Sequence, residues 1–303
     1  MRILEYKYLI PSTADYDNMG FVTYDVNKYP PKQMVAVPLI VLLLALVLLA
    51  VNWASTGMPV TPGIDFAGGT AVTIITTDTT EEITAYFSGF PLESVGEGLS
   101  GGKYIKFGPM SDDQYHDLTV MVGDRYPEAK IDQIGEAFGA TLQQQALIAL
   151  LFSFVGMAIV VFIAFRSFVP SVAVVLSALS DIAITAAIMD IVGIPLTLPT
   201  TAALLMLIGY SVDSDILLTT RLLKRQGKTE EKLAGAYRTG IIMTTTTIAA
   251  VVAMFLVTTI GQVEVIAQIA AVLLIGLFVD LMNTWVLNAG ILKGYLMGRG
   301  RRA

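Results

Sequence analysis

Two carboxylates, Asp213 and Asp215, stand two residues apart inside a long apolar stretch of the chain. Placing a charged side chain at the centre of a membrane-spanning helix costs about 2.5–3.5 kcal/mol. Acids in such a place are typical of a proton or ion pathway; the alternatives are a structural ion pair or a helix end that reaches water. The two positions differ by about 200° around a helix, so both cannot face one partner unless the helix is broken.

Polar side chains recur at helical spacing in two other apolar segments. Asp181 lies in a stripe with Ser177 and Thr185, and Asp280 is followed by Asn283. Ser and Thr residues in such stripes often serve to hold helices together, at roughly 0.6 kcal/mol per contact. For the acids we predict binding of protons or ions, because a carboxyl group in hydrocarbon favours its protonated form. The predicted intramembrane polar residues are Asp181, Asp213, Asp215, Asp280 and Asn283.

Arg238 is the basic residue placed to act with these acids. It begins a further apolar segment that carries four consecutive threonines, Thr244–Thr247. One interpretation is a movable counter-ion for Asp213 or Asp215. The other is an interface anchor, since long basic side chains at helix ends extend toward the lipid headgroups.

The composition excludes several kinds of site. The chain has no Cys, which rules out disulfides and thiolate ligands, and one histidine, His116, cannot build a His-based zinc site. The net charge of −6, with basic residues only in short clusters beside apolar segments, argues against a nucleic-acid partner. We expect no metal and no cofactor.

Long apolar runs predict a protein that crosses the membrane several times. The chain is 54% hydrophobic and 15% charged, whereas soluble domains carry about 25% charged residues. We predict a polytopic α-helical membrane protein with six spans, one at 34–53 and five within 145–292. The five later spans are predicted at 145–165, 168–189, 198–218, 239–260 and 265–292.

Basic residues predict the orientation of these spans. If the N-terminal segment 1–33 is cytoplasmic, most Lys and Arg lie inside, including a predicted basic loop at 221–238 and the tail 293–303. Cytoplasmic loops carry such an excess. We therefore predict a plasma-membrane protein with both termini in the cytoplasm. The basic residues left outside are Lys103, Lys106, Arg125 and Lys130.

Segment 54–144 predicts an extracytoplasmic α+β domain between the first and second spans. Strand-like and helix-like segments follow in the order β-α-β-β-α-β, which suggests a ferredoxin-like module. Ser111 and Gln114 form a capping box before its second helix, and a Gly-rich turn at 98–102 predicts a hairpin.

Three motifs carry a resemblance to a known family. They are Gly63-Ile-Asp65-Phe66-Ala-Gly68-Gly69-Thr70, Gly209-Tyr-Ser-Val-Asp213-Ser-Asp215 and Tyr237-Arg238-Thr239. The chain resembles, over nearly its whole length, the SecD/SecF family of protein-export membrane proteins in the resistance-nodulation-division superfamily. Where bacterial members have Asn-Asp, this chain has Asp213-Ser214 followed by Asp215, so it resembles the archaeal members. The first motif is a domain tether, in which Asp65 is expected to cap its own turn.

The resemblance implies a function in protein export. Such subunits act with SecD on the SecYE-type channel and use the proton-motive force to help move preproteins outward; they are not enzymes. It implies a proton relay of Asp213, Asp215 and Arg238, with Asp213 preferred because it matches an aspartate of SecD. The alternatives are a scaffold for SecD without its own relay, a small-molecule efflux subunit of the superfamily, and an intramembrane aspartyl protease. The last lacks its G-x-G-D pattern here.

Overall fold

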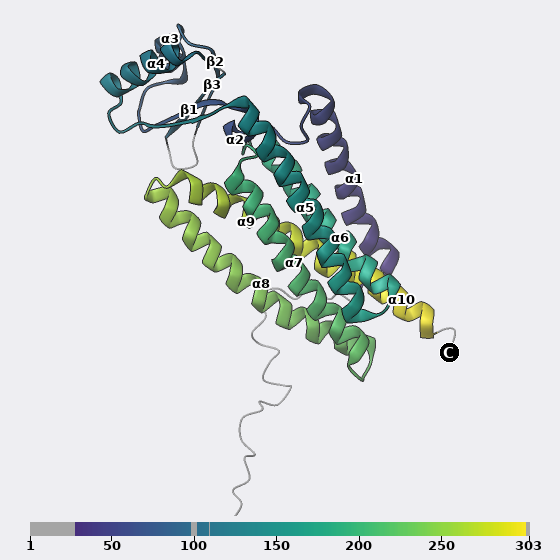
Figure 1. Ribbon diagram of the computed structural model, residues 1–303. Coiled ribbons are helices and arrows are strands. Elements are labelled where there is room, and N and C mark those ends of the chain that lie inside the picture. The colour runs from purple at the N-terminus through teal and green to yellow at the C-terminus, as the bar shows by residue number, and fades with distance from the viewer. Residues whose placement is uncertain (1–27, 98–101, 109, 301–303) are drawn as a thin grey trace, which may run out of the picture.

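A bundle of long helices carries a small α+β domain at one end (Figure 1). In this computed structural model, the structure describes residues 28–97, 102–108 and 110–300. Within these residues six helical segments are long and apolar enough to cross a membrane, which confirms the predicted number of spans. Residues 1–27 and 301–303 of the predicted terminal segments, and 98–101 of the predicted turn, lie outside the described residues.

The last membrane-length segment is composite, because a π-helical turn interrupts it. It consists of α9, the π-helical turn η1 and α10, whereas the sequence predicted one regular helix. The helices of the bundle are α1 Pro31–Thr56, α5 Glu136–Phe165, α6 Phe168–Ile191, α7 Leu198–Lys224, α8 Thr229–Ile260, α9 Glu264–Met282, η1 Asn283–Asn288 and α10 Ala289–Gly300.

The predicted basic loop at 221–238 is wrong, because α7 and α8 leave only residues 225–228 between them. The last turn of α7 carries Arg221 and Lys224, and the first turn of α8 carries two glutamates. Basic residues at a helix C-terminus and acidic residues at an N-terminus interact favourably with the helix dipole. These charged turns therefore continue the two helices beyond the apolar region. Hydropathy alone does not predict helix there. For the same reason α5 begins at Glu136, before its apolar part.

The α+β domain has the predicted order of elements. Its four strands form one sheet in the order β2-β3-β1-β4, and every neighbouring pair is antiparallel. This confirms the small α+β domain and its β-α-β-β-α-β order. Its elements are α2 Ile64–Ala67, β1 Gly69–Ile74, α3 Thr80–Tyr86, β2 Leu92–Glu97, β3 Lys103–Phe107, α4 Asp112–Arg125 and β4 Lys130–Ile134.

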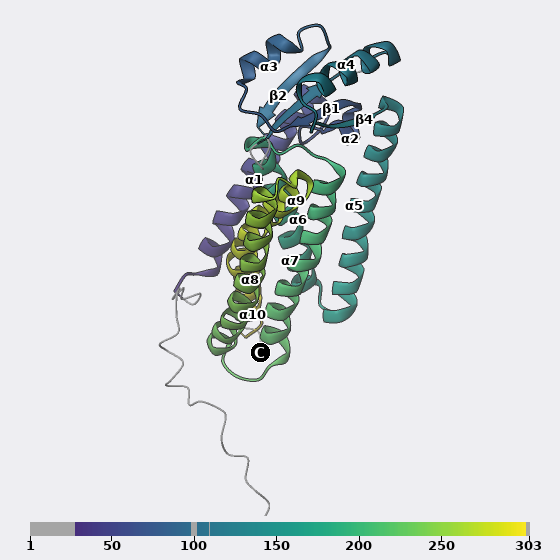
Figure 2. The ribbon, with the colours of Figure 1, turned by 90° about the vertical axis from the view of Figure 1, so that its left-hand side faces the viewer.

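One face of this sheet is covered by α3 and α4, and the other faces the bundle (Figure 2). The helix-covered side is the core, where Val72, Ile105 and Leu118 are fully buried. Both helices begin with a capping box; in α4 the Ser111 hydroxyl accepts from the Gln114 backbone N–H, as predicted. The opposite face of the sheet is left without a helix layer of its own.

A hydrogen-bonded triad ties the end of α4 to the connection between β1 and α3. Tyr126 Oη donates to Asp78 Oδ2 at 2.7 Å and Arg125 Nη2 donates to the same oxygen at 2.8 Å. The Tyr126 hydrogen bond and the Arg125 charge lower the pKa of Asp78 below 3.8. Burial and the bond to Asp78 raise the pKa of Tyr126 to about 12.

These shifts predict how the stability of the domain depends on pH. The Asp78 contribution is complete above the unfolded pKa of 3.8 and is lost as the pH falls through the lowered folded value. The Tyr126 contribution is lost as the pH rises from 10 through about 12. We expect Asp78→Asn to lower the thermal midpoint at about pH 7, and the difference from the wild type to shrink progressively as the pH falls below 3.8. Near-UV circular dichroism of the full chain measures this. A difference between the two proteins that does not change with pH would contradict it.

Candidate functional site

Three helices bring three aspartates together inside the bundle. Asp181 of α6 and Asp215 of α7 have no exposed surface, and Asp280 of α9 is 2% exposed. Gly276 of α9 has no side chain, so Leu207 of α7 packs directly against the α9 backbone and the two helices lie close together. Apolar residues surround the cluster above and below, so these carboxyl groups lie in a medium of low polarity.

Asp181 is held by one hydroxyl and one amide from different helices. Ser211 Oγ donates to Asp181 Oδ2 at 2.5 Å, and Asn283 Nδ2 donates to Asp181 Oδ1 at 2.7 Å. Asn288 Nδ2 donates to Asp215 Oδ1 at 2.7 Å. The donors that the structure gives these carboxylates are therefore neutral groups.

Thr284 lies between the other two acids. Its Oγ1 is 3.0 Å from Asp215 Oδ1 and 3.0 Å from Asp280 Oδ1. Ser214 Oγ is 3.0 Å from Thr284 Oγ1 and 3.2 Å from Asp280 Oδ1. A hydroxyl has a single hydrogen, so Thr284 can donate to one of the two carboxylates at a time. A proton bound at one acid therefore sets which acid receives the Thr284 hydrogen.

The π-helical turn η1 makes this arrangement possible. Asn283 and Asn288 are five residues apart, which on a regular α-helix would place them about 140° from each other. In a π-helix residues five apart lie one above the other. Both amides therefore face the acids, Asn283 at Asp181 and Asn288 at Asp215. Asn283 and Thr284 were recognised as polar residues at helical spacing after Asp280, whereas Asn288 was missed because it faces the acids only through the π turn.

Several buried polar atoms at the cluster have no hydrogen-bond partner among the described residues. Asp215 Oδ2, Asn288 Oδ1, Ser177 Oγ and Thr219 Oγ1 are among them. Buried polar groups in native proteins normally have a partner in the protein or in ordered water. The network thus has unused hydrogen-bonding capacity, both donors and acceptors, around Asp215.

The structure separates the two acids of α7. Asp215 joins the cluster, whereas Asp213 is exposed on the outside of the bundle, as their angle around the helix predicts. The preference for Asp213 is not supported by this placement. Arg238 is also exposed, on α8. The predicted residues that meet in the buried cluster are therefore Asp181, Asp215, Asp280 and Asn283.

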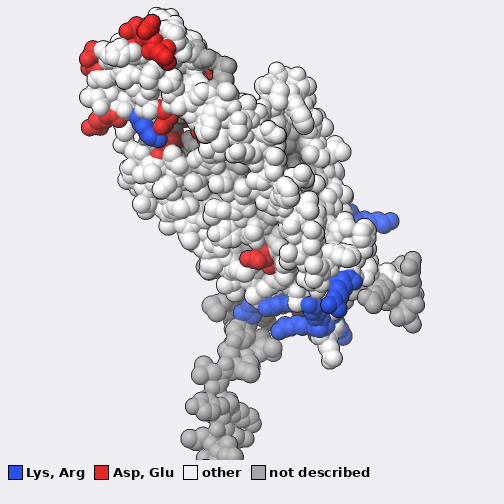
Figure 3. Space-filling model, viewed as in Figure 1, with Lys and Arg blue, Asp and Glu red and all other residues white. Residues whose placement is uncertain are grey.

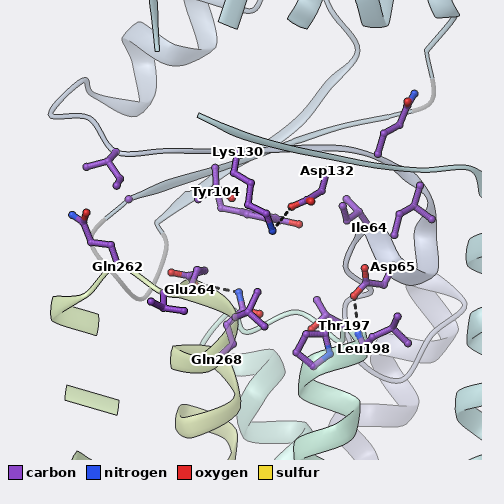
Figure 4. Close-up of a pocket in the computed structure, with 18 of the residues that line it drawn as sticks. Ile64, Asp65, Tyr104, Lys130, Asp132, Thr197, Leu198, Gln262, Glu264 and Gln268 are labelled. Atoms are coloured by element: carbon purple, nitrogen blue, oxygen red, sulfur yellow. Dashed lines mark hydrogen bonds and ion pairs between the residues drawn. The ribbon is translucent and has the colours of Figure 1, made fainter. Parts of the chain in front are cut away.

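The tether motif is joined directly to the helix that carries Asp215. Asp65 Oδ2 accepts a hydrogen bond from the Leu198 backbone N–H at 2.7 Å, so it caps α7 (Figure 4). The expectation that Asp65 caps its own turn is wrong, because that carboxylate satisfies a free N–H of another helix. Gly63 N donates to Leu196 O at 2.7 Å, and a Cβ at Gly63 would lie 2.5 Å from Thr197 Cγ2. The close approach of tether and α7 thus requires glycine.

The other residues of the motif shape the entry into the sheet. Phe66 is 5% exposed, and Gly68 and Gly69 have φ of 75° and 107°. Only glycine adopts such backbone angles without strain. The motif therefore forms a rigid link that runs from the start of α7 into the first strand of the outer domain.

Removing the Asp65 cap is expected to loosen this link. Thr197 is the N-cap of α7, and Asp65 adds a charged acceptor for the N–H of Leu198. A hydrogen bond to a charged group contributes about 1.5–3 kcal/mol, and the amide oxygen of asparagine can accept the same bond. Asp65→Ala should speed hydrogen exchange in the first turn of α7, and Asp65→Asn should leave it close to the wild type. Hydrogen–deuterium exchange of the detergent-solubilised chain measures both. Equal exchange in the two variants would show that the cap does not hold this helix end.

The comparisons with known proteins decide the family. Residues 114–298 match the family described as "Protein export membrane protein SecD/SecF, C-terminal". The chain belongs to the SecD/SecF family. A relative from Methanolacinia petrolearia, named protein-export membrane protein SecF, is 62% identical over 93% of this chain and 100% of its own length. The SecF proteins of Haloferax volcanii and Pyrococcus furiosus are 44% and 41% identical over 89% of this chain, covering 94% and 92% of their own lengths. SecD/SecF membership confirms the resemblance seen in the three motifs.

A solved SecD/SecF structure has the same fold. The crystal structure of SecDF from Thermus thermophilus, described as a translocon-associated membrane protein, superposes with a TM-score of 0.72 at 23% identity. The match covers 91% of this chain and 40% of that one, so this chain spans well under half of the SecDF polypeptide. SecDF in its super-membrane-facing form superposes with a TM-score of 0.58 and 22% identity over 90% of this chain and 40% of that one.

Proposed function

We propose that this chain acts with SecD in protein export and that its buried acid cluster binds and releases protons driven by the proton-motive force. One observation carries the proposal: Asp181, Asp215 and Asp280 share a buried network whose hydrogen-bond donors are neutral. A buried carboxylate without a cationic partner costs several kcal/mol, and protonation removes that cost. Proton binding is therefore the simplest way to make the cluster stable.

Proton binding can be converted into movement by the contacts around α7. A proton that crosses 100 mV releases about 2.3 kcal/mol. This energy shifts an equilibrium between two states by roughly fifty-fold, since 1.4 kcal/mol is a factor of ten. Protonation changes the direction of the Thr284 hydroxyl and thus the contacts between α7 and η1. Movement of α7 reaches the outer domain through the Asp65 cap.

The charge distribution supports an orientation with the α+β domain outside the cell. Lys and Arg gather at the end of the bundle farthest from that domain, and acidic residues gather on the domain (Figure 3). The excess of Lys and Arg in cytoplasmic segments of membrane proteins supports placing the basic end inside. In this orientation the proposed partners are the exported preprotein at the outer face of the chain and the channel at its membrane face.

We place SecD against the exposed face of α7. Asp213 is exposed there, and its neighbours Met206 and Tyr210 are 48% and 40% exposed. A carboxylate that faced lipid would be costly, so a polypeptide that supplies a donor is the better neighbour. This chain matches 40% of the Thermus SecDF chain, so the unmatched part of that polypeptide is long enough to include a SecD portion beside the matched one.

Replacing Asp213 is expected to weaken the complex with SecD. Removing one partner of a buried, hydrogen-bonded charge pair costs about 2–5 kcal/mol. Asp213→Ala should therefore reduce the SecD that co-purifies with this chain in mild detergent, while Asp215→Asn retains it. Full retention of SecD by Asp213→Ala would place the partner elsewhere.

Translocation in vesicles tests the proposed function. Inside-out vesicles that contain this chain, SecD and the channel are given a labelled preprotein with and without a protonophore. We expect the chain to increase translocation only when the proton gradient is intact. An increase that is unchanged by the protonophore would favour the scaffold for SecD.

A further inference from the structure

A hollow of about 750 Å³ lies between the sheet of the outer domain and the bundle (Figure 4). A second hollow of about 320 Å³ lies beside it, and Tyr104, Glu264 and Gln268 line both. The two hollows therefore meet beneath the middle of the sheet. Together they form one passage, here called the subsheet cleft, between the face of the sheet that has no helices and the outer ends of the bundle helices.

One row of residues across all four strands forms the roof of the subsheet cleft. The pairing register places Gly96 opposite Tyr104, Tyr104 opposite Thr73, and Thr73 opposite Lys130. Each of these four residues lines one or both hollows. The cleft therefore runs across the whole width of the sheet, which suits a long, narrow ligand better than a compact one.

The lining combines apolar and acidic side chains. Ile75, Leu198 and Val265 line the larger hollow and are 53%, 42% and 43% exposed. The carboxylates outnumber the lysines by six to two. The charged residues that line the cleft are Asp65, Glu93, Glu97, Glu128, Asp132 and Glu264, with Lys106 and Lys130.

The acidic character is concentrated at the centre of the subsheet cleft. Both lysines are already paired, Lys106 with Glu93 at 3.0 Å and Lys130 with Asp132 at 2.9 Å. Burial, together with the charges of Asp65, Asp132 and Glu264, raises the pKa of Tyr104 to about 12. The phenol thus lies in a negative potential, which attracts cationic groups and repels the phosphates of lipids.

We propose that the subsheet cleft holds an extended segment of the exported polypeptide, with preference for segments that carry basic and apolar side chains. An unfolded chain is long and narrow like the cleft, its apolar side chains match Ile75, Leu198 and Val265, and its Lys and Arg match the carboxylates. This inference rests on the proposed function for the identity of the ligand. It adds the place where the substrate is held.

Photo-crosslinking in the assembled vesicles tests this assignment. p-Benzoylphenylalanine is introduced in place of Ile75, and in a matched protein in place of Val120, which is 50% exposed on α4 at the opposite side of the sheet. A preprotein stalled in the channel carries either a Lys-rich or a Glu-rich segment beyond the membrane. We expect a several-fold higher yield of preprotein adduct from position 75 than from position 120, and a higher yield with the Lys-rich segment. Glu128→Gln in the position-75 protein should reduce the Lys-rich adduct and leave the Glu-rich adduct unchanged.

Three outcomes would overturn the inference. They are equal adducts from positions 75 and 120, adducts to SecD or to lipid in place of preprotein, and no difference between the two substrates. Failure of the proposed function is a separate result. If adducts form at position 75 but translocation is insensitive to the protonophore, the cleft holds substrate without proton coupling. If translocation needs the gradient but no adduct forms, the proton proposal stands and the cleft assignment fails.

Discussion

Asp215→Asn is expected to abolish the part of preprotein translocation that depends on the proton gradient. The asparagine fits the same space and keeps hydrogen bonds with Thr284 and Asn288, but it cannot bind and release a proton. The gradient supplies about 2.3 kcal/mol per proton at 100 mV, so the lost stimulation is at most roughly fifty-fold. Initial rates in inside-out vesicles, with and without protonophore, measure the loss.

A matched control removes a carboxylate of the same type elsewhere. Asp124 is exposed on α4, away from the buried cluster. Asp124→Asn should keep the full response to the gradient. If Asp215→Asn keeps it as well, while both proteins bind SecD normally, the cluster does not couple protons to export.

Gly69→Ala is expected to have the largest effect on the stability of the outer domain. Gly69 has φ of 107°, and a Cβ there would overlap the carbonyl oxygen of Phe107. That oxygen belongs to backbone paired with β1, at the register of Thr70 with Phe107, so it cannot move without breaking the sheet. The unfavourable φ costs about 1–3 kcal/mol and the overlap a similar amount, about 2–6 kcal/mol together.

Hydrogen–deuterium exchange of β1 and β3 in the full chain measures this loss. Where exchange occurs through opening of the domain, each 1.4 kcal/mol raises the rate by about tenfold. Gly96→Ala is the control, because a Cβ at Gly96 meets nothing closer than 3.9 Å and lies in the same sheet. Exchange in Gly69→Ala no faster than in Gly96→Ala would show that the backbone relaxes at little cost.

Local signals were sufficient to predict most of the fold. The capping box of Ser111 and Gln114 gave the start of α4, and the apolar runs gave six spans, because both depend on residues close in sequence. Helix ends outside the apolar region were missed at α5, α7 and α8. There charged residues such as Glu230 and Glu231 continue the helix, but their low hydropathy predicted a loop.

The site was predicted in composition but not in geometry. The acids Asp181, Asp215 and Asp280 were identified because charge is rare in apolar segments. The choice between Asp213 and Asp215 depends on which face of α7 meets α9, and this is a property of tertiary packing. Asn288 was missed because its position depends on the π turn, which forms only when neighbouring helices hold it.

The tether shows the same limit. Gly68 and Gly69 of the motif Gly63–Thr70 have the positive φ that only glycine adopts without strain. The contact between Asp65 and α7 was not predicted, because Leu198 is 133 residues away along the chain. Contacts between distant segments therefore carry the link between the acid cluster and the outer domain.

Infrared titration of the reconstituted complex with SecD tests proton binding at the cluster most directly. Carboxyl and carboxylate groups absorb at different frequencies, and labelling of aspartate with ¹³C assigns the bands. We expect a protonated carboxyl band that disappears as the pH is raised across the range in which the complex is stable, and that is absent in Asp215→Asn. A spectrum that stays constant over this range, or a titrating band that persists in Asp215→Asn and disappears in Asp213→Asn, would contradict the role assigned to the buried cluster.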